Sequence, residues 1–201
     1  MKKTFIFGAA FAALVACGGP KAQELVIGEV SYEGELTEVA MTPTTPNCPE
    51  YVVVNRPQVK LEDFPMDADG FYVIFNGNEK MQGWRGYGKD NIPSRWSVED
   101  GCIKFTGSGG GEAQTGEGGD LLFAHKFKNF ILEMEWKVSK GGNSGIFYLA
   151  QEIKNDKGEY EPIYISAPEC QVLDNETITY TFLIQNNGNE PIIATDDAIV
   201  T

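Results

Sequence analysis

The clearest alternation of apolar and polar residues lies in the stretch FKNFILEMEWKVS, residues 127–139. Every second position from Phe130 to Val138 carries a large apolar residue, and the positions between them include two glutamates and a lysine. Successive side chains of a strand point to opposite faces, so this period of two predicts a strand with one face in the core. Trp136 falls on the apolar face and is predicted to be a core residue rather than a platform for a sugar ring.

Other stretches carry weaker signals of the same kind. FYVIFNG (71–77) predicts a strand that runs into a turn, and RWSVEDGCIKFTG (95–107) predicts a hairpin. The turn of that hairpin is Asp100-Gly101, a pair that favours a tight primed turn. No long 3.6-residue period follows the N-terminal region. The chain is therefore predicted to be all-β, with an antiparallel β-sandwich as the architecture.

Two predicted strands carry polar residues where a buried strand would have apolar ones. In SAPECQVLDN (166–175), Glu169 and Gln171 alternate with Cys170 and Val172, so the two pairs point to opposite sides. Side-chain carboxylates and amides on one sheet face can match the hydroxyl groups of a sugar.

The stretch GGNSGIFYLAQE (141–152) is rich in glycine. Its glycines are predicted to frame Asn143 and Ser144 in a turn where the backbone could approach a ligand closely.

Glu133 and Glu135 lie two residues apart on the predicted strand 130–138. Their Cα atoms should be about 6.5–7 Å apart. Two carboxylates at such a spacing could act on one substrate. A strand face that is merely solvated has the same pattern, so both interpretations stay open.

The N-terminus has the features of an export signal. Lys2 and Lys3 precede the apolar run TFIFGAAFAALVA (4–16), which is too short to span a bilayer. The sequence LVAC (14–17) resembles a bacterial lipobox. Residues 1–16 are thus predicted to be a lipoprotein signal peptide, with lipidation at Cys17. The predicted location is the bacterial cell envelope, where the lipid anchors the chain on the periplasmic or outer surface; a plain secretory signal is the alternative.

Residues 17–69 are predicted to be a lipid anchor and linker. MTPTTPNCPE (41–50) holds three prolines in ten residues, which favours an extended spacer. YVVVN (51–55) could still add an edge strand. Further along, SGGGEAQTGEGG (108–119) has six glycines in twelve residues and is predicted to be a surface loop. It lacks the Lys-Ser/Thr that a phosphate-binding loop requires.

Composition narrows the set of partners. The formal net charge of the 201-residue chain is −13 with no basic cluster, so nucleic acid is not an expected partner. Cys48, Cys102 and Cys170 form no C-x-x-C motif, and small buried side chains with at most one bridge are expected. The single histidine, His125, is expected to be structural. Acidic residues could hold Ca²⁺, but no calcium-loop motif is present, so a cofactor remains open.

Four segments in order carry a family resemblance: FNGNEKMQGWRGYG (75–88), WSVEDGCIKF (96–105), the stretch 127–148, and APECQVLDN (167–175). Together they resemble the 3-keto-disaccharide hydrolase family over residues 70–175. GGNSGIF followed by E-x-Q-V-L-D-N is the more specific pair. The resemblance implies a concanavalin A-like jelly roll, an oligosaccharide or glycoside substrate, and cleavage of glycosidic bonds in 3-keto sugars.

The chemistry that the resemblance implies requires a carboxylate to act as a general base. A ketone at C3 acidifies the C2 proton, so a general base can remove it while the glycosidic oxygen leaves C1, and water then adds back. At the matching positions the resemblance implies catalytic Glu135 and Glu169 and substrate-binding Asn143, Gln171 and Asp174. Glu169 is the hypothesised base.

Residues 176–201 resemble something else, the start of a β-sandwich repeat of large bacterial surface proteins. Alternation from Ile178 to Ile184 predicts a strand that ends at the turn NNGN (186–189). The resemblance to the hydrolase family is therefore predicted to cover only the N-terminal half of that domain, as an incomplete sandwich. Three functions stay open: the enzyme, a non-catalytic carbohydrate-binding module, and an inactive truncated fragment.

Overall fold

The computed structural model describes residues 4–7, 25–41, 49–107, 118–173 and 179–184. These residues form strands and short connections, with two single-turn 3₁₀ helices, η1 (Leu61–Asp63) and η2 (Ile163–Ile165). The all-β prediction is confirmed. The strands are β1 (Thr4–Phe7), β2 (Tyr32–Glu33), β3 (Thr37–Ala40), β4 (Val52–Asn55), β5 (Gln58–Val59), β6 (Phe71–Phe75), β7 (Trp84–Gly86), β8 (Trp96–Glu99), β9 (Cys102–Phe105), β10 (Leu121–Phe123), β11 (Phe130–Glu135), β12 (Asn143–Phe147), β13 (Glu152–Lys154), β14 (Glu169–Leu173) and β15 (Thr179–Ile184).

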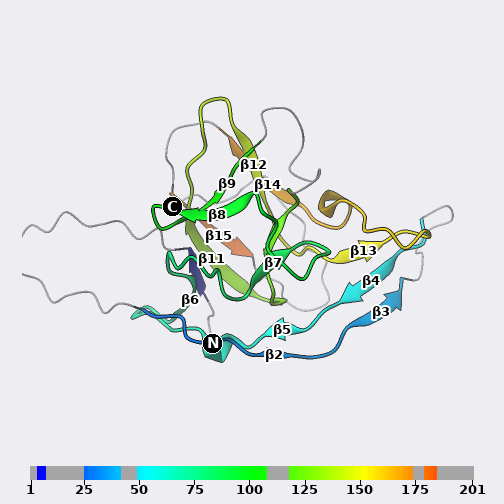
Figure 1. The fold of residues 1–201 in the computed structure, drawn as a ribbon, viewed down its shortest axis with the longest axis horizontal. Helices are drawn as coiled ribbons and strands as arrows, with labels where there is room; N and C mark the ends of the chain where they lie inside the picture. Colours follow the sequence, from blue (N-terminus) through cyan, green and yellow to red (C-terminus); the bar gives the residue numbers. More distant parts are fainter. Residues whose placement is uncertain (1–3, 8–24, 42–48, 108–117, 174–178, 185–201) are drawn as a thin grey trace, which may run out of the picture.

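The strands group into small sheets. The largest has the order β15-β11-β1-β6, and β13-β4-β3 forms a second sheet of three strands. The remaining pairs are β10-β7, β12-β14, β2-β5 and β8-β9. Figure 1 shows β3, β4 and β13 reaching to one side of the body formed by β6 to β12. All of the named strand pairs are antiparallel except the two that β1 makes, in line with the predicted antiparallel sandwich.

The core forms where β6, β7 and the segments around them meet. Its buried side chains are Ile27, Val59, Leu61, Phe64, Ile74, Phe75, Met81, Trp84 and Ala124. The Trp84 indole Nε1–H donates to the Ile74 carbonyl oxygen at 2.9 Å, so burying this ring leaves no unpaired donor. Phe130 and Leu132 of β11 pack against the core as the period of two predicts. Trp136 is half-buried and follows the end of β11.

Part of the expected linker is packed rather than extended. Ile27, Val59, Leu61 and Phe64 all belong to the core, with Val59 at 0% exposure. The stretch from Tyr51 onward is rich in Val, Leu and Phe, and burying these apolar side chains offsets the loss of chain entropy. The 51–55 stretch forms β4, which pairs with both β3 and β13 and is therefore a central strand, not the expected edge strand.

Two local predictions are confirmed at residue level. Asp100 and Gly101 have φ angles of 52° and 72°, as the primed turn of the β8–β9 hairpin requires. The alternation after Ile178 forms β15, which pairs antiparallel with β11. The tail strand thus adds to the same sheet as β11 rather than starting a separate one.

The cysteine prediction is wrong for Cys102, which is an exposed free thiol on the hairpin; Cys170 is free and half-buried. The apolar side of the hairpin is filled by Val98, Ile103 and the ring contact between Trp96 and Phe105, so position 102 falls on the open face. His125 has the expected structural role, with Nδ1 2.8 Å from the Val59 carbonyl oxygen. Across the described segments, no helix is long and apolar enough to cross a membrane.

Candidate functional site

The β12–β14 ribbon brings three of the predicted site residues onto one face. β12 and β14 pair antiparallel with Asn143 opposite Leu173, Gly145 opposite Gln171, and Phe147 opposite Glu169. Residues that lie directly opposite each other in an antiparallel pair share a face. Asn143, Gln171 and Glu169 therefore lie on the same side of the ribbon, and all three are exposed. Gly145 lies within the strand rather than in the predicted turn, whereas Gly141, with φ of +69°, does lie in a turn.

The Glu169 side chain lies over Gly145. A Cβ built on Gly145 would overlap the carboxyl Oε1, Cδ and Cγ atoms of Glu169, far inside van der Waals contact. Gly145 and Glu169 are diagonal neighbours across the ribbon, so Glu169 reaches toward the strand only because position 145 has no side chain. The glycine in GGNSGIF thus makes room for a carboxylate.

The opposite face of the ribbon turns inward. Val172 is buried at 5% exposure, and Cys170 is half-buried beside it in sequence. Burial raises the pKa of the Cys170 thiol, and the negative charge of Glu169 raises this pKa further. The predicted alternation in CQVLD is confirmed.

Asp120 is a second acidic group near Glu169, and sequence reasoning missed it. Burial raises the pKa of the Asp120 carboxyl group, and the negative charge of Glu169 raises it further. The two carboxyl groups therefore lie within electrostatic range of each other. The sequence offered only a weak indication of this residue: Asp120 is an aspartate that follows the glycine-rich stretch and directly precedes β10.

Three hydrogen bonds fix the backbone that carries Asp120. Lys89 Nζ donates to the Gly118 carbonyl at 3.0 Å, and the Trp96 indole Nε1–H donates to the Gly119 carbonyl at 2.8 Å. The Tyr87 N–H donates to the Asp120 carbonyl at 2.8 Å. A backbone anchored by hydrogen bonds restricts the positions that the side chain attached to it can take.

Glu135 is on a different sheet from these groups. It ends β11, lies opposite Thr179 of β15, and is exposed. Glu133, two residues earlier, is half-buried, and burial raises the pKa of its carboxyl group, as do the charges of Asp67 and Asp69. Asp174 and Cys17, two further predicted functional residues, lie outside the described residues.

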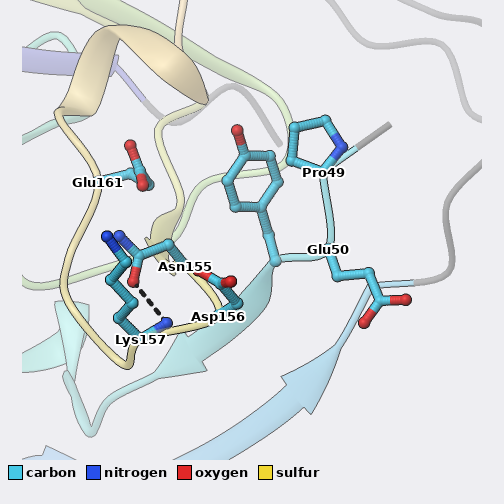
Figure 2. A pocket seen from close by; sticks show the side chains of 7 residues that line it. Pro49, Glu50, Asn155, Asp156, Lys157 and Glu161 are labelled. Carbon is cyan, nitrogen blue, oxygen red and sulfur yellow. Dashed lines mark hydrogen bonds between the residues drawn. The ribbon is translucent and has the colours of Figure 1, made fainter. Parts of the chain in front are cut away.

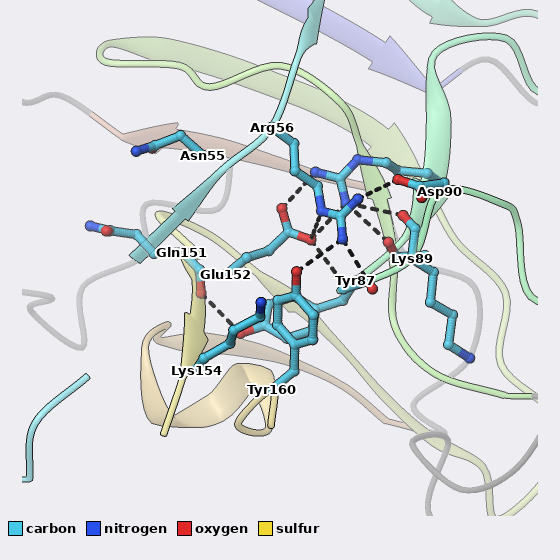
Figure 3. A network of polar contacts seen from close by, with 12 residues as sticks. Asn55, Arg56, Tyr87, Lys89, Asp90, Gln151, Glu152, Lys154 and Tyr160 are labelled. Carbon is cyan, nitrogen blue, oxygen red and sulfur yellow. Dashed lines mark hydrogen bonds and ion pairs between the residues drawn. The ribbon is translucent and has the colours of Figure 1, made fainter. Parts of the chain in front are cut away.

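A buried polar network joins three segments beside β7 (Figure 3). Glu152 on β13 accepts from both terminal nitrogens of Arg85, at 2.7 and 2.6 Å, and from the Gly88 N–H at 2.7 Å. Arg56 Nε lies 3.5 Å from the same carboxylate, and the Arg56 NH2 group donates to the Tyr160 hydroxyl at 2.9 Å. These donors surround the Glu152 carboxylate, so the network joins the segments that carry Arg56, Arg85 and Glu152.

An open pocket of about 530 Å³ lies elsewhere (Figure 2). Its lining consists of Pro49, Glu50, Tyr51, Asn155, Asp156, Lys157 and Glu161. None of the ribbon residues belongs to this lining. Among the described residues, no group of three or more histidine, cysteine or acidic side chains is placed to hold a metal ion.

Comparison with known proteins decides the family. The family model described as "3-keto-alpha-glucoside-1,2-lyase-like domain" matches residues 70–189. The chain belongs to this family. The match includes Asp120 and the β12–β14 ribbon, and it continues past Asn175, where the sequence motifs end.

One relative of the chain carries a functional name. A protein of Bacteroides thetaiotaomicron named 3-keto-disaccharide hydrolase is 54% identical over 181 residues. The aligned region covers 88% of this chain and 58% of that relative, so the chain spans under two thirds of the relative's length.

Proposed function

We propose that this protein cleaves glycosidic bonds of 3-keto sugars by base-assisted elimination followed by hydration, with Glu169 as the base. The proposal rests on the 1,2-lyase-like family, the hydrolase name of the relative, and one structural observation. That observation is the Glu169 carboxylate over Gly145, within electrostatic range of Asp120.

The reaction balances in two steps. In the first, the base takes the proton from C2, the C2–H electron pair forms a C1=C2 double bond, and the C1–O bond breaks. The departing glycosidic oxygen takes up a proton. In the second, water adds a proton to C2 and a hydroxyl group to C1, so the sum is hydrolysis. A 1,2-lyase describes the first step and a hydrolase describes the sum, so the two names are compatible.

The two carboxyl groups suit different parts of this reaction. Glu169 is exposed on the ribbon face, where a sugar ring could reach it, and a carboxylate there can accept the C2 proton. The raised pKa of Asp120 keeps its carboxyl group protonated to higher pH. A carboxyl group that stays protonated can donate its proton, so we assign Asp120 as the proton donor to the leaving oxygen.

The amides on the ribbon suit substrate binding. Asn143 and Gln171 share the face of Glu169 and can each offer N–H donors and a carbonyl acceptor. Such donors can bind sugar hydroxyl groups or the enolate oxygen that develops at C3. Asp174 directly follows this strand in sequence and stays a proposed substrate-binding residue. Glu135 stays a second proposed catalytic residue, on the sheet of β11.

The predicted export signal indicates where in the cell the protein would act. We infer that residues 1–16 direct export and that Cys17 carries the lipid, so that the domain meets glycosides at the cell envelope. One acyl chain gives only marginal membrane binding, whereas more than one anchors stably.

Deuterium at C2 of a 3-keto-disaccharide tests the elimination step. We expect the released keto sugar to have lost its C2 deuterium to the solvent and the unoxidised parent disaccharide to stay intact. The isolated C2-deuterated keto sugar, incubated without protein, controls for spontaneous exchange. Product that keeps its deuterium, or equal cleavage of the parent disaccharide, would exclude elimination.

A further inference from the structure

Strand β3 is the outermost strand of the sheet β13-β4-β3 (Figure 1). The strand at the opposite side, β13, is covered by the turn that follows it, because the Glu161 N–H donates to the Ile153 carbonyl at 2.9 Å. Among the described residues, β3 pairs with β4 alone. In this part of the chain the sheet therefore has an open edge, here named the β3 edge: the side of Thr37–Ala40 that faces away from β4.

The register with β4 determines which backbone groups point outward from the β3 edge. The Met41 N–H donates to the Tyr51 carbonyl at 2.8 Å, so Met41 belongs to a hydrogen-bonded pair with the neighbouring strand. Such pairs alternate along an antiparallel ladder. Val39 consequently bonds to β4, whereas the N–H and C=O groups of Glu38 and Ala40 point away from it. Outward groups of this kind are a template for pairing with a further strand.

An apolar row crosses the sheet and ends at the β3 edge. Ile153 of β13, Val53 of β4 and Val39 of β3 lie directly opposite one another and share one face. Ile153 is 3% exposed, Val53 is half-buried and Val39 is 54% exposed, so the burial of the row is lost toward the edge. A second strand beside β3 would extend the row and cover Val39.

The segment that includes β3 also holds most of the exposed large apolar side chains of the described residues. Those in the segment are Val26, Tyr32, Leu36, Val39 and Met41, and those elsewhere are Met66, Tyr164 and Ile165. Exposed apolar residues that occur singly are ordinary, whereas their concentration in one place indicates an interaction surface.

The strand is complementary to a second copy of itself. A two-fold axis that continues the sheet sets a residue of one copy opposite a residue on the same face of the other. An axis at Glu38 would set two glutamates opposite each other, which is destabilising. An axis at Val39 sets Val39 opposite Val39 of the second copy and Glu38 opposite Ala40 of the second copy. Within β3, this register alone joins the outward groups of both Glu38 and Ala40.

The charges at the β3 edge permit this register. Glu38 Oε1 lies 2.6 Å from Lys154 Nζ of the same chain, on the face opposite to Val39. The Glu38 carboxylate is thus neutralised by its own sheet and stays apart from the apolar row. A strand of a different protein would need its own matching sequence, whereas a second copy supplies a compatible residue opposite each residue of β3.

We propose that two copies of this chain pair antiparallel through their β3 edges, about a two-fold axis at Val39, and so join their sheets into one. The paired strands are short, which places the dimer among small, transient contacts. The formal net charge of −13 opposes association at long range, so salt should strengthen the dimer. The predicted lipid at Cys17 would hold both copies on one membrane and raise their effective concentration. The inference is independent of the proposed catalytic roles.

Cysteine cross-linking of the full chain in bacterial membranes tests the register. Val39→Cys places two thiols opposite each other at a non-hydrogen-bonded pair, where Cα atoms are about 4.5 Å apart, within the range that a disulfide spans. Thr37→Cys is the matched control, because it is exposed on the same face but its copy would lie about 14 Å away. Under mild oxidation, we expect at least tenfold more linked dimer from Val39→Cys than from Thr37→Cys.

The unmodified chain gives the background of linking through the native cysteines, and mass spectrometry of the linked peptides confirms that the bond joins the two introduced thiols. Equal linking by the two variants, or linking by neither above this background, would overturn the proposal.

Sedimentation of the full chain in detergent tests the pairing without an added thiol. Ala40→Pro removes an outward donor, which an edge strand tolerates, and leaves the ladder with β4 intact; Ala40→Val keeps the donor. We expect the dimer of Ala40→Pro to dissociate roughly tenfold more readily than those of Ala40→Val and the unmodified chain, because each copy loses a hydrogen bond. A monomeric unmodified chain, or a dimer that Ala40→Pro leaves unchanged, would contradict pairing at the β3 edge. The cross-linking result stands even if Ala40→Pro folds poorly.

Discussion

The carboxyl group of Glu169 lies in the space where any residue larger than glycine at position 145 would place its Cβ. Strands β12 and β14, which are separated by more than twenty residues in sequence, create this arrangement. Gly145 lies opposite Gln171, which is two residues along β14 from Glu169. A glycine in mid-strand costs stability. In this ribbon, the missing side chain leaves the space that the Glu169 carboxyl group occupies.

Replacing Gly145 with alanine should displace Glu169 without changing any charged group. Misplacing a catalytic group by about 1 Å can cost roughly 10²-fold in rate, so we expect a loss of that order in kcat on a 3-keto-disaccharide. Gly28→Ala is the matched control, because a Cβ there meets nothing within 4 Å. Equal rates for the two variants would show that the position of Glu169 does not matter.

Asp120→Asn should stabilise the protein in a pH-dependent way. The pKa of Asp120 is higher in the folded protein than its ordinary value, so ionising it favours unfolding. Stability from this group is complete while the carboxyl is protonated, and it is lost as pH rises through the folded pKa. Asparagine cannot ionise, so its advantage should be near zero below the ordinary pKa of about 3.9 and grow above it.

Urea unfolding of both proteins between pH 4 and 8 measures this difference. Asp156→Asn, at an exposed position, serves as the control and should show no such trend. An advantage of Asp120→Asn that is constant with pH, or that grows toward acid, would contradict the assigned pKa direction. If Asp120 also donates the proton to the leaving oxygen, turnover should fall by about 10²–10⁴-fold in the same variant.

Glu152→Gln should destabilise the fold strongly. The Glu152 side chain is 7% exposed and those of Arg85 and Arg56 are 12% and 13% exposed, so the change leaves buried guanidinium charge uncompensated. Breaking a buried ion pair in this way costs about 3–5 kcal/mol of the free energy of unfolding.

The control for this prediction is Glu38→Gln, whose side chain is 50% exposed in its ion pair with Lys154. An exposed pair contributes about 0–1 kcal/mol. Denaturant titration of the three proteins gives the comparison, and similar midpoints for both variants would show that the network around Glu152 is not structural.

Cys17→Ala tests the anchor. In a bacterial host labelled with a fatty-acid analogue, we expect the unmodified chain to carry label and to sediment with membranes. The alanine variant should carry no label and keep residues 1–16, because the thiol that receives the lipid is missing. A chain cleaved at the same place with or without Cys17 would point to the plain secretory signal instead.

Local patterns in the sequence predicted local structure well. The alternation around Leu132 and the Asp100-Gly101 pair are properties of single stretches, and β11 and the β8–β9 hairpin follow them. The face shared by Glu169 and Gln171 was also predictable, because alternation within one strand determines it.

The features that the sequence did not predict depend on contacts between residues that are distant in sequence. Asp120 becomes notable only because folding brings it within range of Glu169, and Arg56 meets Glu152 from a segment that the prolines nearby suggested was a spacer. The alternation of apolar and polar residues within one stretch carries no information about such long-range contacts. The role of Gly145 likewise appears only when the register between β12 and β14 is known, since a glycine in a strand can equally mark a bulge or a tight bend.

The most direct test of the account is turnover of a 3-keto-disaccharide by the full chain and by Glu169→Gln, with Glu99→Gln as a surface control. Glu99 is exposed in an ion pair with Lys104, and its loss should leave the rate unchanged. We predict sugar release by the unmodified chain and a decrease of about 10²–10⁴-fold in Glu169→Gln, as expected for a general base. Full turnover by Glu169→Gln would contradict the assigned base, and no release by the unmodified chain would contradict the enzyme itself.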